Sequence, residues 1–381
     1  MSSDRLPFTL EAECTGTAAR ATTFQTLHGA VHTPTFMPVG TRATVKAQLT
    51  QTLEDCGAQV LLANTYHLLL RPGPEVFERL GGIHKFMTWP RPVLTDSGGY
   101  QIFSLNRQQP MTEEGAVFKS NLDGRDLLLS PERSIATQLS IGSDILMALD
   151  QCIPSTADRS AAEEAVGRTR RWAARSLEAR GDVAPALFGI VQGALFEDLR
   201  RRSAEALTEL PFDGFALGGL AVGEAREERE AVCEFAAPLL PRLRPRYLMG
   251  VGTPLDLLEA VHRGLDMFDC IMPTQVAQRG GAFTSRGFLQ LRRGVYNFSK
   301  DALDPACGCP TCCRYTRAYL SHLIKSKETL GWQLLGQHNL YFYQQLMRDI
   351  RASILSGTFL ELYRERRAFL HAPDLDYPTD P

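Results

Sequence analysis

Short apolar runs recur along the chain, and each ends in glycine or a polar residue. There are eight of them, at residues 35–40, 60–66, 92–99, 145–150, 186–193, 214–220, 246–252 and 267–273. Between most of them apolar residues follow helical spacing, as at 157–181, where Asp158 is a candidate N-cap, and at 195–210 and 226–240. Buried strands that alternate with helices predict a parallel sheet, and eight of them predict a (β/α)8 TIM barrel of the α/β class.

The chain has 381 residues, and we expect three parts in it. The barrel, with an N-terminal β-hairpin region, should occupy residues 1–278, a basic zinc-binding insertion 279–345, and a C-terminal helical closure and tail 346–381. From Arg279 to Lys327 nine Lys and Arg stand against two Asp, a local charge of +7, whereas the whole chain carries −2. This asymmetry suggests a bound polyanion, with a solvated basic face as the alternative.

Four cysteines gather in the sequence CGCPTCC at residues 307–313. Cys307, Cys309 and Cys312 form C-x-C-x2-C, which can place three thiolates around one Zn2+ ion that then needs a fourth ligand. Cys313 directly follows one of these ligands, so we expect its side chain to point elsewhere. Spacing leaves two histidines as candidates for the fourth ligand, His322 and His338. The sequence therefore predicts a zinc site rather than a group of free cysteines.

The N-terminus, MSSDRLPFTLEAECTG, has no basic n-region followed by an apolar segment and a cleavage site. No apolar run approaches the ~18 to 20 residues needed to span a bilayer. We therefore expect a cytoplasmic protein without a membrane role, and reducing conditions in the cytoplasm argue against disulfides.

Three aspartates, Asp96, Asp150 and Asp269, stand at the C-terminal ends of predicted strands, where TIM barrels hold their active sites. Taken singly, each could serve an Asx-turn or a simple strand exit. Carboxylates crowded at one barrel mouth repel each other, however, and require a partner or a task. Two carboxylates on opposite sides of a sugar can break and form a glycosidic bond, one as nucleophile and one as proton carrier.

Other groups at the same strand ends suit a flat, carbonyl-bearing base. The adjacent amides of GGL, residues 218–220, and the amide of Gln192 can donate to its carbonyl. Tyr100 and Met249 can cover its two faces. The sequence therefore predicts a nucleobase pocket at the mouth of the barrel.

Several strings in this order, LTDSGGYQIFSL, GGLAVGE, RYLMGVGTP, DMFDCIMPT and CGCPTCC followed by QHNLYFYQQLM, resemble those of the bacterial-type tRNA-guanine transglycosylases, the queuine tRNA-ribosyltransferase family. The similarity extends from about residue 8 to about residue 355. It implies a pentosyltransferase that exchanges guanine at the first anticodon position of tRNA for 7-aminomethyl-7-deazaguanine in queuosine biosynthesis. It also implies a covalent aspartyl-ribose intermediate and a homodimer, with Tyr315 and Tyr319 as candidate contacts.

The resemblance also assigns roles to residues. Asp269 matches the nucleophile, Asp96 the general acid/base, and Asp150 the acceptor for the donor edge of the base. The remaining matches are Gln192 and the Gly219 amide at the base carbonyl, Tyr100 and Met249 as the stacking pair, Leu220 at the aminomethyl group, Glu224 as support of that peptide, and Cys307, Cys309, Cys312 and His338 at the zinc.

Two departures qualify the resemblance. Relatives carry a loop resembling TRSGRNG, whose arginines contact the anticodon loop, where this chain has TQVAQRGG, with Gln275 and Gln278 at those places. Recognition of the neighbouring bases is thus open, and we expect Arg279 to take over part of it. Val222 and Cys152 instead match the users of the aminomethyl precursor rather than of queuine.

Three other functions compete with this interpretation. An archaeosine-type or DNA-modifying exchange enzyme is one, but the archaeal type carries further C-terminal RNA-binding domains. A non-catalytic partner subunit is another, although Asp96 and Asp269 are both present. The third is a zinc-bearing nucleic-acid-binding protein with an inactive barrel.

Overall fold

Eight parallel strands form the central sheet of the chain, which is described here from a computed structural model covering residues 5–105, 111–120 and 124–377. The strands follow one another around the sheet in the order β4 (Thr35–Pro38), β13 (Met267–Cys270), β12 (Arg246–Leu248), β11 (Gly214–Leu217), β10 (Ala186–Val191), β9 (Ile145–Met147), β6 (Val93–Thr95) and β5 (Leu61–Ala63). A parallel bridge between Val39 and Leu62 joins the two end strands. Each of the eight predicted runs contains one of these strands, so the predicted TIM barrel is confirmed.

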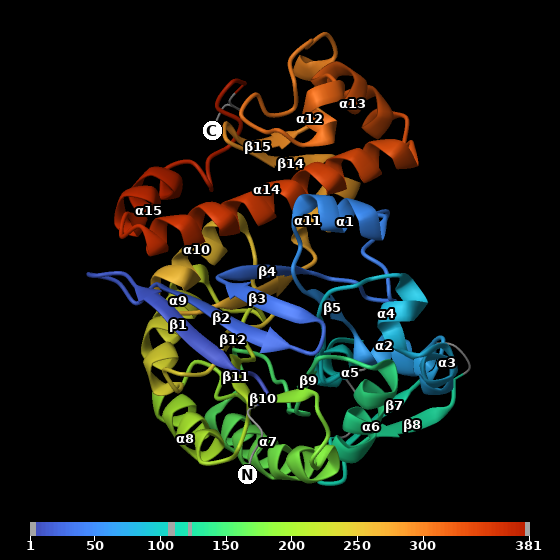
Figure 1. The fold of residues 1–381 in the computed structure, drawn as a ribbon, viewed down its shortest axis with the longest axis vertical. Coiled ribbons are helices and arrows are strands. Elements are labelled where there is room, and N and C mark those ends of the chain that lie inside the picture. The colour runs from blue at the N-terminus through green and yellow to red at the C-terminus, as the bar shows by residue number, and fades with distance from the viewer. Residues whose placement is uncertain (1–4, 106–110, 121–123, 378–381) are drawn as a thin grey trace.

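Helices connect the strands around the outside of the barrel (Figure 1). The helices before the last barrel strand are α1 (Thr50–Cys56), α2 (Thr65–Leu70), α3 (Pro74–Leu80), α4 (Gly82–Met87), α5 (Gly99–Leu105), α6 (Pro131–Ile141), α7 (Arg159–Arg180), α8 (Glu197–Thr208), α9 (Arg226–Ala236), the 3-10 turn η1 (Ala237–Leu239) and α10 (Pro254–His262). As predicted, Asp158 caps α7, because its Oδ1 accepts a hydrogen bond of 2.8 Å from the Ala161 amide. The hairpin of β7 (Ala116–Lys119) and β8 (Asp126–Leu129) lies between α5 and α6 in the chain.

An antiparallel sheet of three strands covers the end of the barrel at which the strands begin. It consists of β1 (Phe8–Glu13), β2 (Arg20–Thr26) and β3 (Gly29–Thr33). Its buried Phe24 and Val31 share one hydrophobic cluster with barrel residues such as Met147 and Phe188. Because apolar side chains fill this end, the polar site can form at the opposite end, where the strands stop.

The inserted subdomain follows the last barrel strand and stands above the barrel in Figure 1. Its elements are α11 (Met272–Gln278), β14 (Gly281–Thr284), β15 (Gly287–Gln290), η2 (Gly294–Tyr296), α12 (Pro310–Arg314) and α13 (Arg317–Lys325), followed by α14 (Thr329–Leu355) and α15 (Phe359–Arg367). The predicted division of the chain at residues 278 and 345 stays a prediction. The end of α11 coincides with the first boundary, whereas α14 runs without interruption through the second.

Helix α14 joins the subdomain to the barrel. Gln344 Nε2 donates to the Phe36 carbonyl at 3.0 Å, and Tyr343 donates to the Gly252 carbonyl at 2.7 Å. Nearer the start of the helix, Asn339 accepts from the amide of Phe283 at 3.1 Å. One helix therefore holds both parts in place with buried polar side chains.

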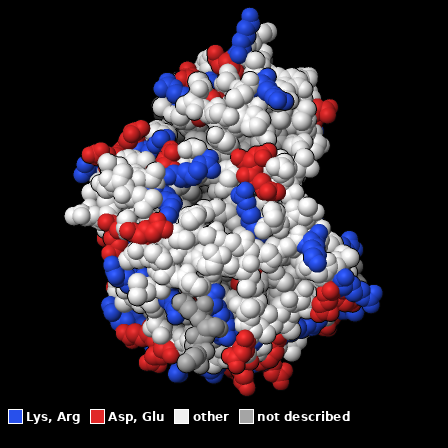
Figure 2. Space-filling model, in the orientation of Figure 1, with Lys and Arg blue, Asp and Glu red and all other residues white. Residues whose placement is uncertain are grey.

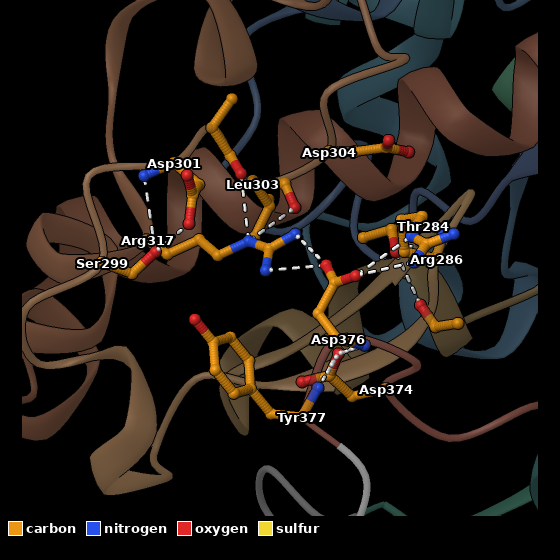
Figure 3. Close-up of polar contacts among 12 residues, drawn as sticks. Thr284, Arg286, Ser299, Asp301, Leu303, Asp304, Arg317, Asp374, Asp376 and Tyr377 are labelled. Carbon is orange, nitrogen blue, oxygen red and sulfur yellow. Dashed lines mark hydrogen bonds and ion pairs between the residues drawn. The ribbon is translucent and has the colours of Figure 1, made fainter.

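The C-terminal tail pairs with part of the basic region. Asp376 lies between Arg286 and Arg317, at 2.9 and 3.1 Å, and Arg317 is itself buried (Figure 3). Asp374 lies 3.4 Å from Arg293. The positive excess expected from the sequence between residues 279 and 327 is therefore smaller in the folded chain, because distant acidic residues return to it. On the face shown in Figure 2, Lys and Arg are interspersed with Asp and Glu over both parts of the molecule.

Within the residues that the structure describes, no helix is both long enough and apolar enough to cross a membrane.

Candidate active site and metal site

A cavity of about 330 Å³ opens at the C-terminal ends of the barrel strands. Asp96, Asp150 and Asp269, each carried by a different strand or the segment just after it, all line this cavity. The structure thus brings together the three aspartates that the sequence analysis singled out. Further residues singled out in the sequence also line it: Tyr100, Cys152, Gly218, Gly219, Leu220, Val222 and Met249.

Asp96, directly after β6, is almost fully surrounded by hydrogen-bond donors. The Thr65 amide donates to Oδ1 at 2.8 Å, while Asn64 Nδ2 and Gln101 Nε2 donate to Oδ2 at 2.5 and 2.7 Å. Burial nevertheless dominates and raises the pKa of Asp96 to about 6, with a smaller contribution from the charge of Asp269. A carboxyl group with this pKa can both give and take a proton near neutral pH.

Asp269, on β13, is held through one oxygen. The Tyr247 hydroxyl and the Gly250 amide donate to Oδ1 at 2.5 and 2.6 Å, and within the described chain Oδ2 accepts no hydrogen bond. Burial raises the pKa of Asp269, while these two donors oppose the shift. The arrangement fixes the carboxylate and leaves one oxygen available to attack an electrophile.

Asp150 and Gln192 form a third unit, in the segments just after β9 and β10. Ser97 Oγ donates to Asp150 Oδ1 at 3.0 Å, and Gln192 Nε2 donates to Oδ2 at 2.7 Å. Gln192 is buried just behind the cavity lining, and its Oε1 has no hydrogen-bond partner among the described residues. Burial raises the pKa of Asp150. A ligand with hydrogen-bond donors on one edge would therefore find acceptors here.

The segment after β11 forms one wall of the cavity. Gly219 has a φ of +64°, a left-handed conformation that glycine adopts without strain. Farther along, the Glu224 carboxylate accepts from the amides of Ala221 and, at 3.0 Å, Val222. Because the Leu220 carbonyl belongs to the same peptide as the Ala221 amide, it points away from Glu224. This geometry agrees with the supporting role expected for Glu224.

The remaining predicted pocket residues frame the opening. Tyr100 is 49% exposed, so its ring can meet a ligand at the surface of the cavity. Met249 lines the same cavity after β12. Val222 and Cys152, which the sequence analysis connected with the size of the ligand, line it as well.

The three cysteines of the C-x-C-x2-C motif surround His338 of α14. Nδ1 of His338 lies 3.6 Å from Cys307 Sγ, 3.6 Å from Cys309 Sγ and 3.3 Å from Cys312 Sγ. Tetrahedral coordination with metal–sulfur and metal–nitrogen bonds of about 2.3 and 2.0 Å separates such atoms by about 3.5 Å. Nε2 of His338 lies 2.7 Å from the Phe283 carbonyl, which orients the ring with Nδ1 toward the sulfurs. These four residues can hold a metal ion.

The structure also separates the two candidate histidines. His322 lies on α13 and is exposed, outside the cluster that His338 completes. Cys313 is exposed and its thiol contacts the Gly308 carbonyl, as expected for a side chain that points elsewhere.

Gln275, Gln278 and Arg279 lie on a helix, not on the loop that the sequence comparison suggested. Residues 272–278 form α11, and Arg279 is its C-terminal cap. Gln278 and Arg279 are exposed, whereas Gln275 is half-buried. The helix follows directly after β13, so these residues stand in the chain between Asp269 and strand β14.

Several residues that hold the aspartates were missed by the sequence analysis. They are Asn64, Thr65, Ser97, Gln101, Tyr247 and Gly250. Tyr247 and Gly250 lie within RYLMGVGTP and Ser97 and Gln101 within LTDSGGYQIFSL, so proximity to a motif was an available signal. Their partners are set by the closing of the barrel, which spacing does not reveal.

Comparison with known proteins gives one consistent result. The family model described as Queuine tRNA-ribosyltransferase matches residues 14–371. A queuine tRNA-ribosyltransferase of Novosphingobium aromaticivorans is 52% identical over 357 residues, which cover 92% of this chain and 96% of the relative. The enzyme of Lactococcus lactis subsp. cremoris (strain MG1363) is 50% identical over 92% of this chain and 92% of the relative. That of Zymomonas mobilis is 49% identical over 96% of this chain and 96% of the relative.

Proposed function

The chain belongs to the queuine tRNA-ribosyltransferase family, and from this we infer a tRNA-guanine transglycosylase of queuosine biosynthesis that exchanges bases through a covalent intermediate on Asp269. One observation carries the mechanism. Among the residues that the structure describes, Asp269 is anchored through Oδ1 alone, and it shares a cavity with Asp96, whose pKa is raised to about 6. A two-step glycosyl transfer requires a fixed nucleophile and a neighbouring group that carries a proton.

In the first step Asp269 Oδ2 attacks C1′ of the ribose that carries the guanine. The O–C1′ bond forms as the C1′–N9 bond breaks, and the guanine takes the bonding electrons together with a proton that Asp96 supplies. The product is an aspartyl-ribose ester on the tRNA.

In the second step the incoming base attacks the same carbon from the face that guanine left. Its N9–H proton passes to Asp96, the new C1′–N9 bond forms, and the ester bond to Asp269 breaks. Two inversions retain the configuration at C1′. Asp96 ends as it began, and since one N-glycosidic bond replaces another, the exchange needs no further energy source.

We propose that the base lies between Tyr100 and Met249, with its donor edge on Asp150. Its carbonyl accepts from Gln192 Nε2, whose second hydrogen is not used by Asp150, and from the Gly219 amide. The Leu220 carbonyl points away from Glu224, and we propose that it accepts a hydrogen bond from the aminomethyl group of 7-aminomethyl-7-deazaguanine. Val222 and Cys152 at the wall leave less room for the larger base queuine.

We propose Zn2+ as the ion of the site formed by Cys307, Cys309, Cys312 and His338. Thiolate and imidazole ligands with tetrahedral spacing suit Zn2+. Four protein ligands leave no position for substrate, so the ion would be structural. It would join α12 to α14 and thereby fix the subdomain on the barrel.

Substrate tRNA with guanine at the first anticodon position would approach the barrel mouth along α11. Reading a single base edge requires the nucleotide to leave the stack. We propose that Gln275, Gln278 and Arg279 contact the anticodon loop, and that the enzyme works in the cytoplasm with its tRNA. The stacked rings of Tyr315 and Tyr319, with centroids 5.6 Å apart beside the metal site, support a homodimer contact, which sedimentation over a concentration series would test.

The decisive experiment traps the intermediate. Wild type incubated with tRNA and free base should give a protein–RNA adduct on a denaturing gel, and guanine should exchange into unmodified tRNA. In Asp269→Asn both should vanish, because an amide is a poor nucleophile. Asp182→Asn, which alters a fully exposed carboxylate, is the matched control. An adduct that persists in Asp269→Asn would assign the nucleophile to another residue.

A further inference from the structure

Arg200 of α8 is fully buried behind the base pocket. Its guanidinium donates to backbone carbonyls on two neighbouring strand ends: Ala194 at 2.9 Å, Val191 at 3.0 Å, Gly218 at 2.8 Å and, with the longest contact, Gly219 at 3.5 Å. A single side chain therefore ties the segment after β10 to the wall after β11.

The surroundings of Arg200 are unusual for a buried cation. Within the described residues it forms no ion pair with a carboxylate, and Glu224 acts on it only as a more distant charge. Burial lowers the pKa of Arg200 to about 10, so the group is still a cation at neutral pH. Burying an unpaired charge is unfavourable, and a shorter apolar side chain would fill an ordinary core position without that cost. The position therefore suggests a task.

The carbonyls that Arg200 binds at Gly218 and Gly219 belong to the same peptides as amides of the base pocket. The Gly218 carbonyl belongs to the same peptide as the Gly219 amide, and the Gly219 carbonyl to the same peptide as the Leu220 amide. In a trans peptide the N–H and C=O point in opposite directions. A cation that hydrogen-bonds to these two carbonyls therefore directs the N–H groups of the same peptides away from itself. Gly218 and Gly219 line the cavity, which places these amides beside it.

The wall is thus held by opposite charges at its two ends. Arg200 donates to the carbonyls of Gly218 and Gly219, and the Glu224 carboxylate accepts from the amides of Ala221 and Val222. Any other orientation of the Gly218–Gly219 peptide would break the shortest hydrogen bond of the guanidinium, the one of 2.8 Å to the Gly218 carbonyl, so Arg200 disfavours such orientations.

We propose that Arg200 is a positioning residue that turns and polarises the peptide amides which bind the carbonyl of the nucleobase. The inference rests on the proposed function and deepens it. A cation bonded to a peptide oxygen makes the N–H of that peptide a stronger donor. The donor then serves both the bound base and the negative charge that the base gains when the glycosidic bond breaks.

The test compares two free bases that differ at the carbonyl. Guanine carries the 6-oxo group and an N1–H, whereas 2-aminopurine lacks both; the N1 difference, which faces Asp150, is the same for every variant and cancels when the ratios are compared. Calorimetry with wild type, Arg200→Met and Arg200→Lys gives the ratio of the two affinities for each protein. The exposed Arg202, two residues along the same helix, provides the matched control Arg202→Met.

Loss of the guanidinium should weaken guanine binding about 10- to 100-fold and change 2-aminopurine binding little. Arg200→Lys should recover part of the ratio, since it keeps the charge but not the forked donors. In steady-state exchange kcat should fall while the KM for tRNA stays near the wild-type value.

Equal losses for both bases would overturn the proposal, since they would indicate general collapse of the pocket. If Arg200→Met does not fold, the same ratio in Arg200→Lys decides, and an unchanged ratio there overturns the proposal. Failure of the proposed function is a separate outcome, because wild type would then exchange no guanine into tRNA, irrespective of Arg200.

Discussion

The three carboxylates of the pocket differ in how many donors reach each oxygen. Asp269 accepts from described residues through Oδ1 alone, whereas Asp96 and Asp150 accept on both oxygens. A carboxylate with a free oxygen suits attack on carbon, and one surrounded by donors suits proton transfer or binding of a base edge. The same residue type thus acquires different properties from its neighbours.

The raised pKa of Asp96 predicts a pH dependence for discharge of the adduct by the incoming base. This step needs the ionised carboxylate, so its rate should fall as the pH drops through about 6, the pKa that burial gives to Asp96. Single-turnover rates from about pH 5 to pH 8 measure it. Asp96→Asn should be about 10²- to 10⁴-fold slower and should lose this dependence. An unchanged pH profile in Asp96→Asn would assign the proton transfer to another group.

The metal site connects two elements that are distant in sequence, the turn before α12 and the middle of α14. Cys309 is the N-cap of α12 as well as one of the four candidate ligands, and His338 is fully buried. Loss of a ligand should therefore loosen the contact between the subdomain and the barrel, not the pocket itself.

Cys309→Ser should remove the bound metal, lower the thermal midpoint by several degrees and weaken tRNA binding. Cys313→Ser, an exposed neighbour outside the cluster, should match wild type in all three respects. Elemental analysis and calorimetry provide the readouts. Full metal content in Cys309→Ser would show that the four predicted ligands are not the site.

Arg279 is exposed at the C-terminal end of α11, close in sequence to Gln275 and Gln278, the positions at which the family resemblance leads us to expect arginines. Arg279→Ala should weaken tRNA binding and reduce the slope of its salt dependence by about one counterion, with free-base affinity unchanged. Binding measured across a salt series, with Arg202→Ala as control, tests this. Identical affinities at every salt concentration would place anticodon recognition elsewhere.

At the scale of the whole molecule, Asp144 fastens the N-terminal sheet to the barrel. Its Oδ1 accepts from the amide of His28, and its Oδ2 from the amide of Val93, each at 2.9 Å. The His28 ring nitrogen lies 2.9 Å from Oδ1 and that of His84 3.1 Å from Oδ2, with the two rings stacked. Three separate parts of the chain therefore meet at one buried carboxylate.

Burial acts to raise the pKa of Asp144, but its contacts with His84, Val93 and His28 outweigh burial and hold the pKa below the ordinary value. A depressed pKa contributes stability above the unfolded value of about 3.9, and that contribution is lost as the pH falls below it. Asp144→Asn should therefore lower the free energy of unfolding by about 2 to 4 kcal/mol near pH 5. The difference from wild type should shrink toward pH 3.

Urea unfolding at both pH values measures this difference, and Asp182→Asn, with its fully exposed side chain, is the control. A difference between Asp144→Asn and wild type that is independent of pH would mean that the loss comes from packing rather than from the charge.

Local patterns determined much of this protein. The apolar runs marked all eight barrel strands, Asp158 marked the start of α7, and the motifs placed Asp96, Asp150 and Asp269 at the strand ends. Periodicity and strand ends are properties of neighbouring residues. The parallel barrel then gathers all strand ends at one mouth, so the sequence could predict the pocket as well as the fold.

Only the tertiary structure decided which partners these residues have. It formed helix α11 where a loop was expected, and it paired Arg286 and Arg317 with Asp376 of the tail. It also placed His338 among the three cysteines, a choice that spacing left open and that the family resemblance alone had implied. It also buried Arg200 on a helix whose sequence is rich in charge. Such outcomes depend on contacts between segments far apart in the chain, whose energies local spacing does not encode, so they follow from the folded arrangement alone.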